Sequence, residues 1–165
     1  MAGPNAAGEP GESATKLVRM QDDCDAETFN AVLGQGACVG DGGTTFEELV
    51  ESLTEDRDAG AWRFSPDRLT IDRGTGLRAL NRGGEVHSFT KVRRFGPGCV
   101  PELNELLGFP AGATVAECTS PRWLRTLRAP GESLRLRGLS AGTHRFECLI
   151  HPWMRTTVRV RPNRG

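Results

Sequence analysis

The segment Cys148-Leu149-Ile150-His151-Pro152-Trp153-Met154 holds a thiol, an imidazole and a thioether within seven residues. Two residues separate Cys148 from His151, and two more separate His151 from Met154. A regular strand carries alternate residues to opposite faces, so it could not aim all three side chains at one point. A tight loop could do so, and the flanking residues 142–147 and 156–160 have the composition of strands. The segment therefore predicts a ligand loop between two strands.

A thiolate, two imidazoles and a weak axial thioether are the ligand set of a type 1 copper centre. The second imidazole is best sought in residues 81–90, where the Gly83-Gly84 turn leads into a short strand that contains His87. Alternation along this strand places His87 on the same face as Phe89, toward the interior. The alternative for His87 alone is a hydrogen-bonded core histidine. The predicted copper ligands are His87, Cys148, His151 and, in the axial position, Met154.

The loop resembles the C-terminal ligand loop of the cupredoxins, the blue copper proteins. Its spacing, with Pro after the His, is most similar to the loop of amicyanin, and the overall pattern is plastocyanin- and azurin-like. Residues 81–87 resemble the turn that delivers the first His ligand, and the resemblance covers roughly residues 69–160. Ser88 stands where Asn is frequent, so the hydrogen bond to the Cys loop is expected to differ. Glu147 stands where plastocyanin has a Tyr, which marks a second site of electron transfer in that protein.

This resemblance implies an all-β fold, a cupredoxin-like Greek-key β-sandwich or barrel with a short helical N-terminal extension. We expect a flexible tail over residues 1–14, a helical extension packed on the barrel over 15–60, and the copper domain over 61–165. Asp25 and Gly34 have the types expected at the two ends of a helix. Thr44 and Glu47 have the spacing of a capping box before a second helix. That helix is either core-facing or a partner-binding amphipathic helix.

Composition excludes several classes of function. The chain has 165 residues, enough for about one domain with a good core. It carries 21 basic and 21 acidic residues, and so offers no strong field for nucleic acid or an anionic membrane. No apolar run approaches the roughly 18 residues of a membrane span. We therefore expect no nucleic-acid partner and no membrane span.

The five cysteines bear on the compartment. If Cys148 binds copper, four remain, and four permit three pairings. Neighbours in sequence suggest Cys24–Cys38 and Cys99–Cys118, and disulfides persist outside the reducing cytoplasm. The prediction is a periplasmic or secreted protein in its mature form, without an export signal in this chain. The alternative is five reduced cysteines in a cytosolic protein.

Together these features predict a one-electron carrier that cycles between Cu(I) and Cu(II) by outer-sphere transfer. Four protein ligands leave no open coordination position, so we expect no enzyme. The expected partners are redox proteins that approach an exposed imidazole edge of His151, framed by Pro152 and Trp153, and the expected state is a monomer. In the alternative, Trp153 only packs on the barrel end. His144 is expected to be structural.

Two other functions use the same sequence features differently. The first is a copper storage, delivery or sensing module with the same ligands. The second is a metal-free β-domain that serves adhesion or partner binding, which requires the ligand loop to be a coincidence.

Overall fold

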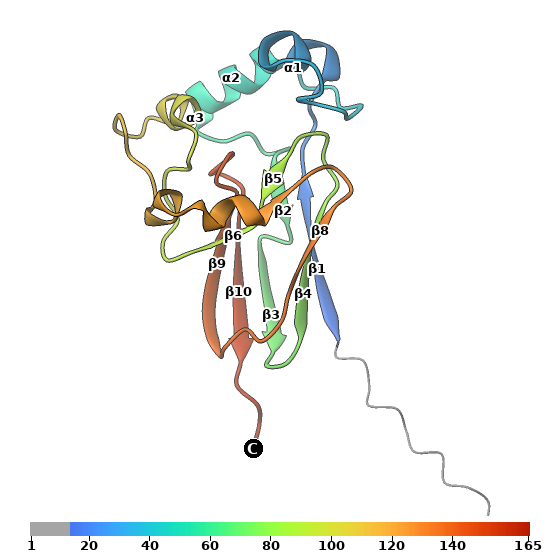
Figure 1. Ribbon diagram of the computed structural model, residues 1–165, viewed down its shortest axis with the longest axis vertical. Helices are drawn as coiled ribbons and strands as arrows, with labels where there is room; N and C mark the ends of the chain where they lie inside the picture. Colours follow the sequence, from blue (N-terminus) through green and yellow to red (C-terminus); the bar gives the residue numbers. More distant parts are fainter. Residues whose placement is uncertain (1–13) are drawn as a thin grey trace, which may run out of the picture.

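Two four-stranded sheets form the body of the protein in the computed structural model, which describes residues 14–165 (Figure 1). The first sheet has the order β2-β1-β4-β8: Arg63–Ser65, Thr15–Gln21, Gly76–Asn81 and Ser133–Leu136. The second has the order β3-β10-β9-β6: Arg68–Asp72, Arg155–Arg161, Gly142–Glu147 and Thr90–Val92. A two-stranded sheet pairs β5 (His87–Ser88) with β7 (Leu127–Arg128).

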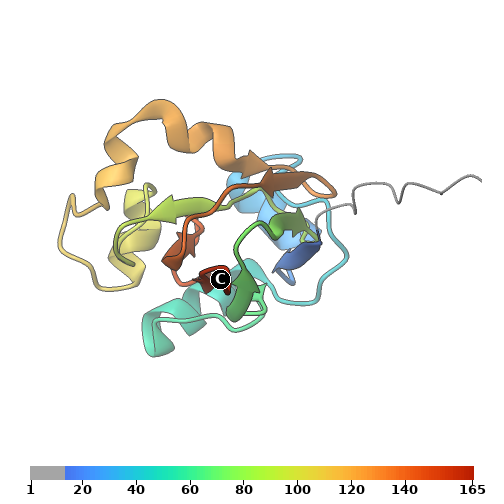
Figure 2. The same ribbon diagram turned by 90° about the horizontal axis from the view of Figure 1, so that it is seen from below.

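Both large sheets are mixed. In the first, β1 runs parallel to β4 and antiparallel to β2. In the second, β10 runs parallel to β3 and antiparallel to β9. Within the described residues no strand pairing joins the two large sheets, so they form an open sandwich and the expected alternative of a closed barrel is wrong. Seen from below, the two sheets lie as separate layers (Figure 2).

Alternating side chains from both sheets fill the space between them. Along β10, the buried positions are Thr156, Val158 and Val160. The ring of Phe89 stacks on Phe146 at a centroid distance of 4.5 Å. Period-two burial of this kind is what a sheet with one face on a core produces.

Helices cover the end of the sandwich opposite the C-terminus (Figure 1). The described chain contains three α-helices and two 3-10 helices, so the all-β expectation holds only for the sandwich itself. The elements are α1 (Ala26–Leu33), α2 (Phe46–Asp56), α3 (Pro101–Leu106), η1 (Ala116–Thr119) and η2 (Pro121–Thr126). In this part of the chain no helix is long and apolar enough to cross a membrane.

The second helix begins one residue later than the sequence pattern indicated. Its capping box is formed by Thr45 and Glu48, because the hydroxyl of Thr44 is already bonded to the carboxylate of Asp23 at 2.6 Å. The buried side chains of α2 are Leu49 and Leu53, which join the core. The core-facing interpretation of this helix is therefore the one that fits.

The N-terminal part of the chain contributes both to a sheet and to the helical end of the molecule. Residues 15–21 form β1 inside the first sheet. Residues 22–62 form an insertion between β1 and β2 that carries α1 and α2, and its buried side chains belong to the same core as the sheets. The division of the chain at residue 60 stays a prediction, and all but the last residue of the expected tail, 1–14, lies outside the described residues.

Candidate metal centre

The loop after β9 returns directly into β10. The amide of Cys148 donates to the carbonyl of Met154 at 3.0 Å, and the amide of Met154 donates to the carbonyl of His151 at 2.9 Å. Glu147 and Arg155 face each other as the last pair of the ladder. The loop is therefore closed by backbone bonds at its base, as a rigid ligand loop requires.

The loop meets the strand β5, and three predicted ligands come together. The Nδ1 atoms of His87 and His151 lie 3.1 Å apart, and the Sγ of Cys148 lies 3.7 Å from Nδ1 of His151. One donor atom from each residue lies within 4.8 Å of the others, and all three side chains are buried. Met154 is also fully buried and belongs to the loop closure, while its role as an axial ligand stays a prediction.

Backbone amides surround the sulfur. The amides of Ser88 and His151 point to the Sγ of Cys148 at 3.3 Å and 3.4 Å. The hydroxyl of Ser88 also accepts a bond from the amide of Leu149 at 2.8 Å, so Ser88 joins the two ligand segments at the position where Asn is frequent in cupredoxins. Burial alone raises the pKa of Cys148, but hydrogen bonds to His151 and His87 outweigh burial and hold this pKa well below its usual value.

The outer nitrogen of His87 faces a buried carboxylate. Nε2 of His87 lies 2.7 Å from Oδ2 of Asp22, whose side chain is 1% exposed. Burial raises the pKa of Asp22, but the bonds to His87 and to the amide of Gly84 lower it to about 2. For His87, burial lowers the pKa and the bond to Asp22 raises it, with a net increase.

The outer nitrogen of His151 also faces a carboxylate. Nε2 of His151 lies 3.6 Å from Oε2 of Glu85, which accepts a hydrogen bond from Nε1 of Trp62 at 2.7 Å. Burial lowers the pKa of His151, but the charge of Glu85 and the thiol of Cys148 raise it to about 10. The Gly-Gly turn before His87 and the position of Asp22 just after a strand were the only sequence signals for these two carboxylates.

His151 does not reach the surface, so the expected exposed imidazole edge is wrong. Its side chain is 4% exposed because Glu85 covers Nε2 and Trp153 packs edge-on at a centroid distance of 5.4 Å. Trp153 is itself only partly buried, and its Nε1 donates to the carbonyl of Ala59 in the insertion at 3.2 Å.

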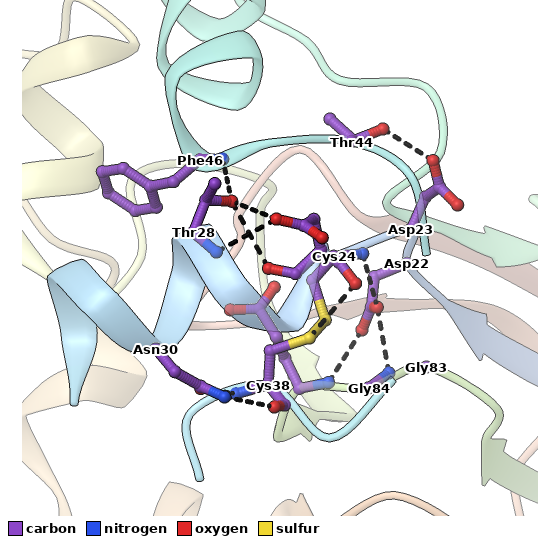
Figure 3. The surroundings of a disulfide bond; sticks show 12 residues. Asp22, Asp23, Cys24, Thr28, Asn30, Cys38, Thr44, Phe46, Gly83 and Gly84 are labelled. Atoms are coloured by element: carbon purple, nitrogen blue, oxygen red, sulfur yellow. Dashed lines mark hydrogen bonds between the residues drawn. A yellow bond between two sulfur atoms is a disulfide. The ribbon is translucent and has the colours of Figure 1, made fainter. Parts of the chain in front are cut away.

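Two disulfides form with the expected pairing, and each supports one side of the cluster. Cys24–Cys38 ties the start of the insertion, next to Asp22 (Figure 3). Cys99–Cys118 lies beside the ligand loop, where the amide of Cys99 donates to the carbonyl of Leu149 at 2.6 Å. His144 is not part of the cluster, and its Nε2 lies 2.8 Å from the carbonyl of Ser140.

The donor geometry fits a metal ion. Because both Nε2 atoms face carboxylates, the ring protons belong on Nε2, and this leaves two Nδ1 lone pairs opposed at 3.1 Å. Two acceptors this close repel each other unless a proton or a cation lies between them. With a buried thiol on the same side, the set suits copper better than magnesium or calcium, which take oxygen ligands.

Known proteins that resemble this chain are found among solved structures. No family model matches it, and no curated protein matches it in sequence. Among solved structures it is similar to "Novel Purple Cupredoxin from Nitrosopumilus maritimus", with 20% identity over 65% of this chain and 92% of that one, at a TM-score of 0.40. It is also similar to an amicyanin variant in the Cu(I) form, with 18% identity over 62% of this chain and 76% of that one, at a TM-score of 0.39. Values this low do not assign a family, so the proposals below rest on the chain's own residues.

Proposed function

We propose that this protein is a mononuclear type 1 copper protein and carries one electron at a time. The supporting observation is the buried cluster of His87, Cys148 and His151, with both Nδ1 atoms and the sulfur facing one point. Copper bound there would supply one-electron chemistry between Cu(I) and Cu(II). Met154 is proposed as the weak axial ligand, which tunes the potential more than it adds bond strength.

The chain's contribution is a frame that moves little. Backbone bonds close the ligand loop, Ser88 ties that loop to β5, and each imidazole is held from outside by a carboxylate. A frame of this kind limits the change in geometry between oxidation states, which favours fast outer-sphere transfer. Four protein ligands leave no open position for a substrate, so we propose a carrier and not an enzyme.

Electrons would pass on the side of Trp153. His151 is covered, but the Trp153 ring contacts it and lines two hollows at the surface together with Asp58 and Arg155. We propose that a redox partner protein docks there briefly. The two disulfides support a compartment outside the reducing cytoplasm, such as the periplasm.

The test is a titration of the metal-free protein with Cu(II), followed by visible absorption. We expect an intense blue thiolate-to-copper band at one equivalent, lost completely in Cys148→Ser. The matched control is Ser140→Ala, a small hydroxyl removed from a loop outside the cluster, which should keep the band.

A colourless product would contradict the carrier function. Rapid loss of Cu(I) to a weak chelator, with the band intact, would instead favour copper delivery or storage with the same ligands. The full burial of the three donors favours slow exchange and therefore the carrier.

A further inference from the structure

We propose that Asp22 and Glu85 are outer partners of the two imidazoles, which hold both Nδ1 atoms toward Cys148 and make the centre prefer a divalent over a monovalent ion. This inference rests on the proposed function and deepens it, because it names the residues that would set the redox preference. Of the two carboxylates, Asp22 makes the larger contribution to both effects.

Asp22 is bonded at every side of its carboxylate. Oδ1 accepts from the amides of Gly84 at 2.9 Å and Cys24 at 3.3 Å (Figure 3). Oδ2 accepts from the amide of Glu85 at 3.0 Å and lies 2.7 Å from Nε2 of His87. A carboxylate with this many donors stays ionised when buried, so it can accept the ring proton of His87 and fix the direction of the ring.

The contact between Asp22 and His87 needs space in the turn before His87, and the two glycines of that turn, Gly83 and Gly84, provide it. A Cβ at Gly83 would overlap Oδ2 of Asp22 and lie 2.9 Å from Nε2 of His87. A Cβ at Gly84 would lie 2.7 Å from Sγ of Cys24, and so would clash with the Cys24–Cys38 disulfide. The Gly83-Gly84 pair therefore allows the insertion and the ligand turn to meet.

Sheet register brings Asp22 to this turn. In the parallel pair of β1 and β4, Met20 lies opposite Asn81. Two residues further along the chain, just past the ends of the two strands, are Asp22 and Gly83. Beyond Asp22, the backbone carbonyl of Asp23 accepts from the amide of Thr44 at 2.9 Å. Asp22 is therefore held from both sides and cannot turn away from His87 without breaking the start of the insertion.

Glu85 is a weaker partner of the same kind. Its distance of 3.6 Å to Nε2 of His151 is longer, and its Oε2 is held by Trp62 at 2.7 Å. Trp62 stacks on Phe29 of α1 at 5.8 Å, so the insertion supports this carboxylate as well.

Charge explains the preference for a divalent ion. The thiolate of Cys148 and the carboxylates of Asp22 and Glu85 place three negative charges around one ion, while liganding imidazoles are neutral. A monovalent ion leaves one more negative charge uncompensated than a divalent ion does. In a buried site that difference is screened less than in water.

The experiment compares Asp22→Asn and Glu85→Gln with the control Asp23→Asn, which removes the same charge from the neighbouring residue. Dissociation constants for Cu(II) and Cu(I) are measured by chelator competition, and the midpoint potential by spectroelectrochemistry. We expect Asp22→Asn to weaken Cu(II) binding about 10- to 100-fold, with Cu(I) binding nearly unchanged. Each tenfold change in this ratio raises the potential by about 59 mV. Glu85→Gln should act in the same direction by less.

An unchanged Cu(II)-to-Cu(I) ratio in Asp22→Asn, or an equal change in Asp23→Asn, would overturn the inference. A purely structural role for Asp22 would lower stability in both Asp variants without moving the ratio. Nitrogen-15 NMR of the metal-free protein adds an independent readout, because Nε2 of His87 must carry a proton, and an unprotonated Nε2 would also overturn it. If the wild-type protein gives no blue band, the proposed function fails. The inference is then still tested by the ratio of the dissociation constants for Zn(II) and Cu(I), with Zn(II) as the divalent ion in place of Cu(II).

Discussion

The two halves of the candidate centre are built in different ways. Cys148, His151 and Met154 come from one seven-residue loop, whereas His87 is held by Asp22, 65 residues away in the sequence. The loop half is closed by its own backbone bonds, and the other half depends on a parallel strand register and a glycine pair. Local spacing is thus enough to predict the loop half and His87, while the contact between His87 and Asp22 exists only in the folded chain.

Each half has its own disulfide, and removing the two disulfides separately tests whether the halves are independent. We expect Cys24→Ser with Cys38→Ser to lower the free energy of unfolding by about 3 kcal/mol, because the bridge closes a loop of about 15 residues. Release of the segment that holds Asp22 should also weaken Cu(II) binding. Denaturant unfolding measures the change in stability, and chelator competition measures the change in Cu(II) affinity.

The counterpart is Cys99→Ser with Cys118→Ser, which should cost a similar free energy and act instead on the ligand loop, near Leu149. If both double variants changed Cu(II) affinity and the spectrum alike, the two halves would not be independent.

The two buried carboxylates Asp22 and Glu147 differ in the number of hydrogen-bond donors around them. Asp22 has a full set of donors, but Glu147 accepts only from the amide of Gly96 and lies 3.3 Å from Nε of Arg155, with Oε2 unpartnered among the described residues. Burial raises the pKa of Glu147 to about 8. A raised carboxyl pKa means that the folded state holds the proton more tightly than the unfolded state does. This contribution to stability is therefore present at low pH and is lost as the pH rises from about 4.5 to about 8.

In Glu147→Gln this pH dependence should be absent. We expect the metal-free variant to be more stable than wild type at pH 8, by up to about 1.4 kcal/mol for each unit by which folding raises this pKa. Chemical denaturation between pH 5 and pH 9 measures this difference in stability. The control is Glu105→Gln, on the exposed side of α3. A parallel loss of stability with pH in wild type and Glu147→Gln would contradict the assignment.

Met154 gives the smallest expected effect. Replacing it by Leu keeps the volume of a fully buried side chain and removes the thioether. We expect the blue band to remain and the potential to rise, on the order of one tenfold change in redox preference, or about 59 mV. Loss of copper from Met154→Leu would mean that the loop half holds the metal through Met154 as strongly as through His151.

Sequence patterns predicted most of the local structure. Asp25 caps α1 through the amide of Thr28 at 3.0 Å, and both disulfides pair as neighbours. The capping box of α2 was displaced by one residue because a distant partner, Asp23, competes for Thr44. A pattern cannot register such competition, since the competing group comes from another segment.

The remaining errors have the same origin. An imidazole edge of His151 was expected at the surface, but Glu85 and Trp153 cover it, and both are held by the insertion through Trp62 and Ala59. Burial of a side chain depends on what packs over it. For this loop the groups that anchor the covering side chains, Trp62 and the carbonyl of Ala59, come from the insertion.

Residues close together in the chain were enough to predict the loop 148–154, the strand that carries His87 and the strand pattern of the sandwich. Only the packing of distant segments shows that the sandwich stays open, that His151 is closed to solvent, and that Asp22 meets His87. A buried carboxylate is stable only where donors from separate segments converge on it, and strand register, not local spacing, brings those segments together.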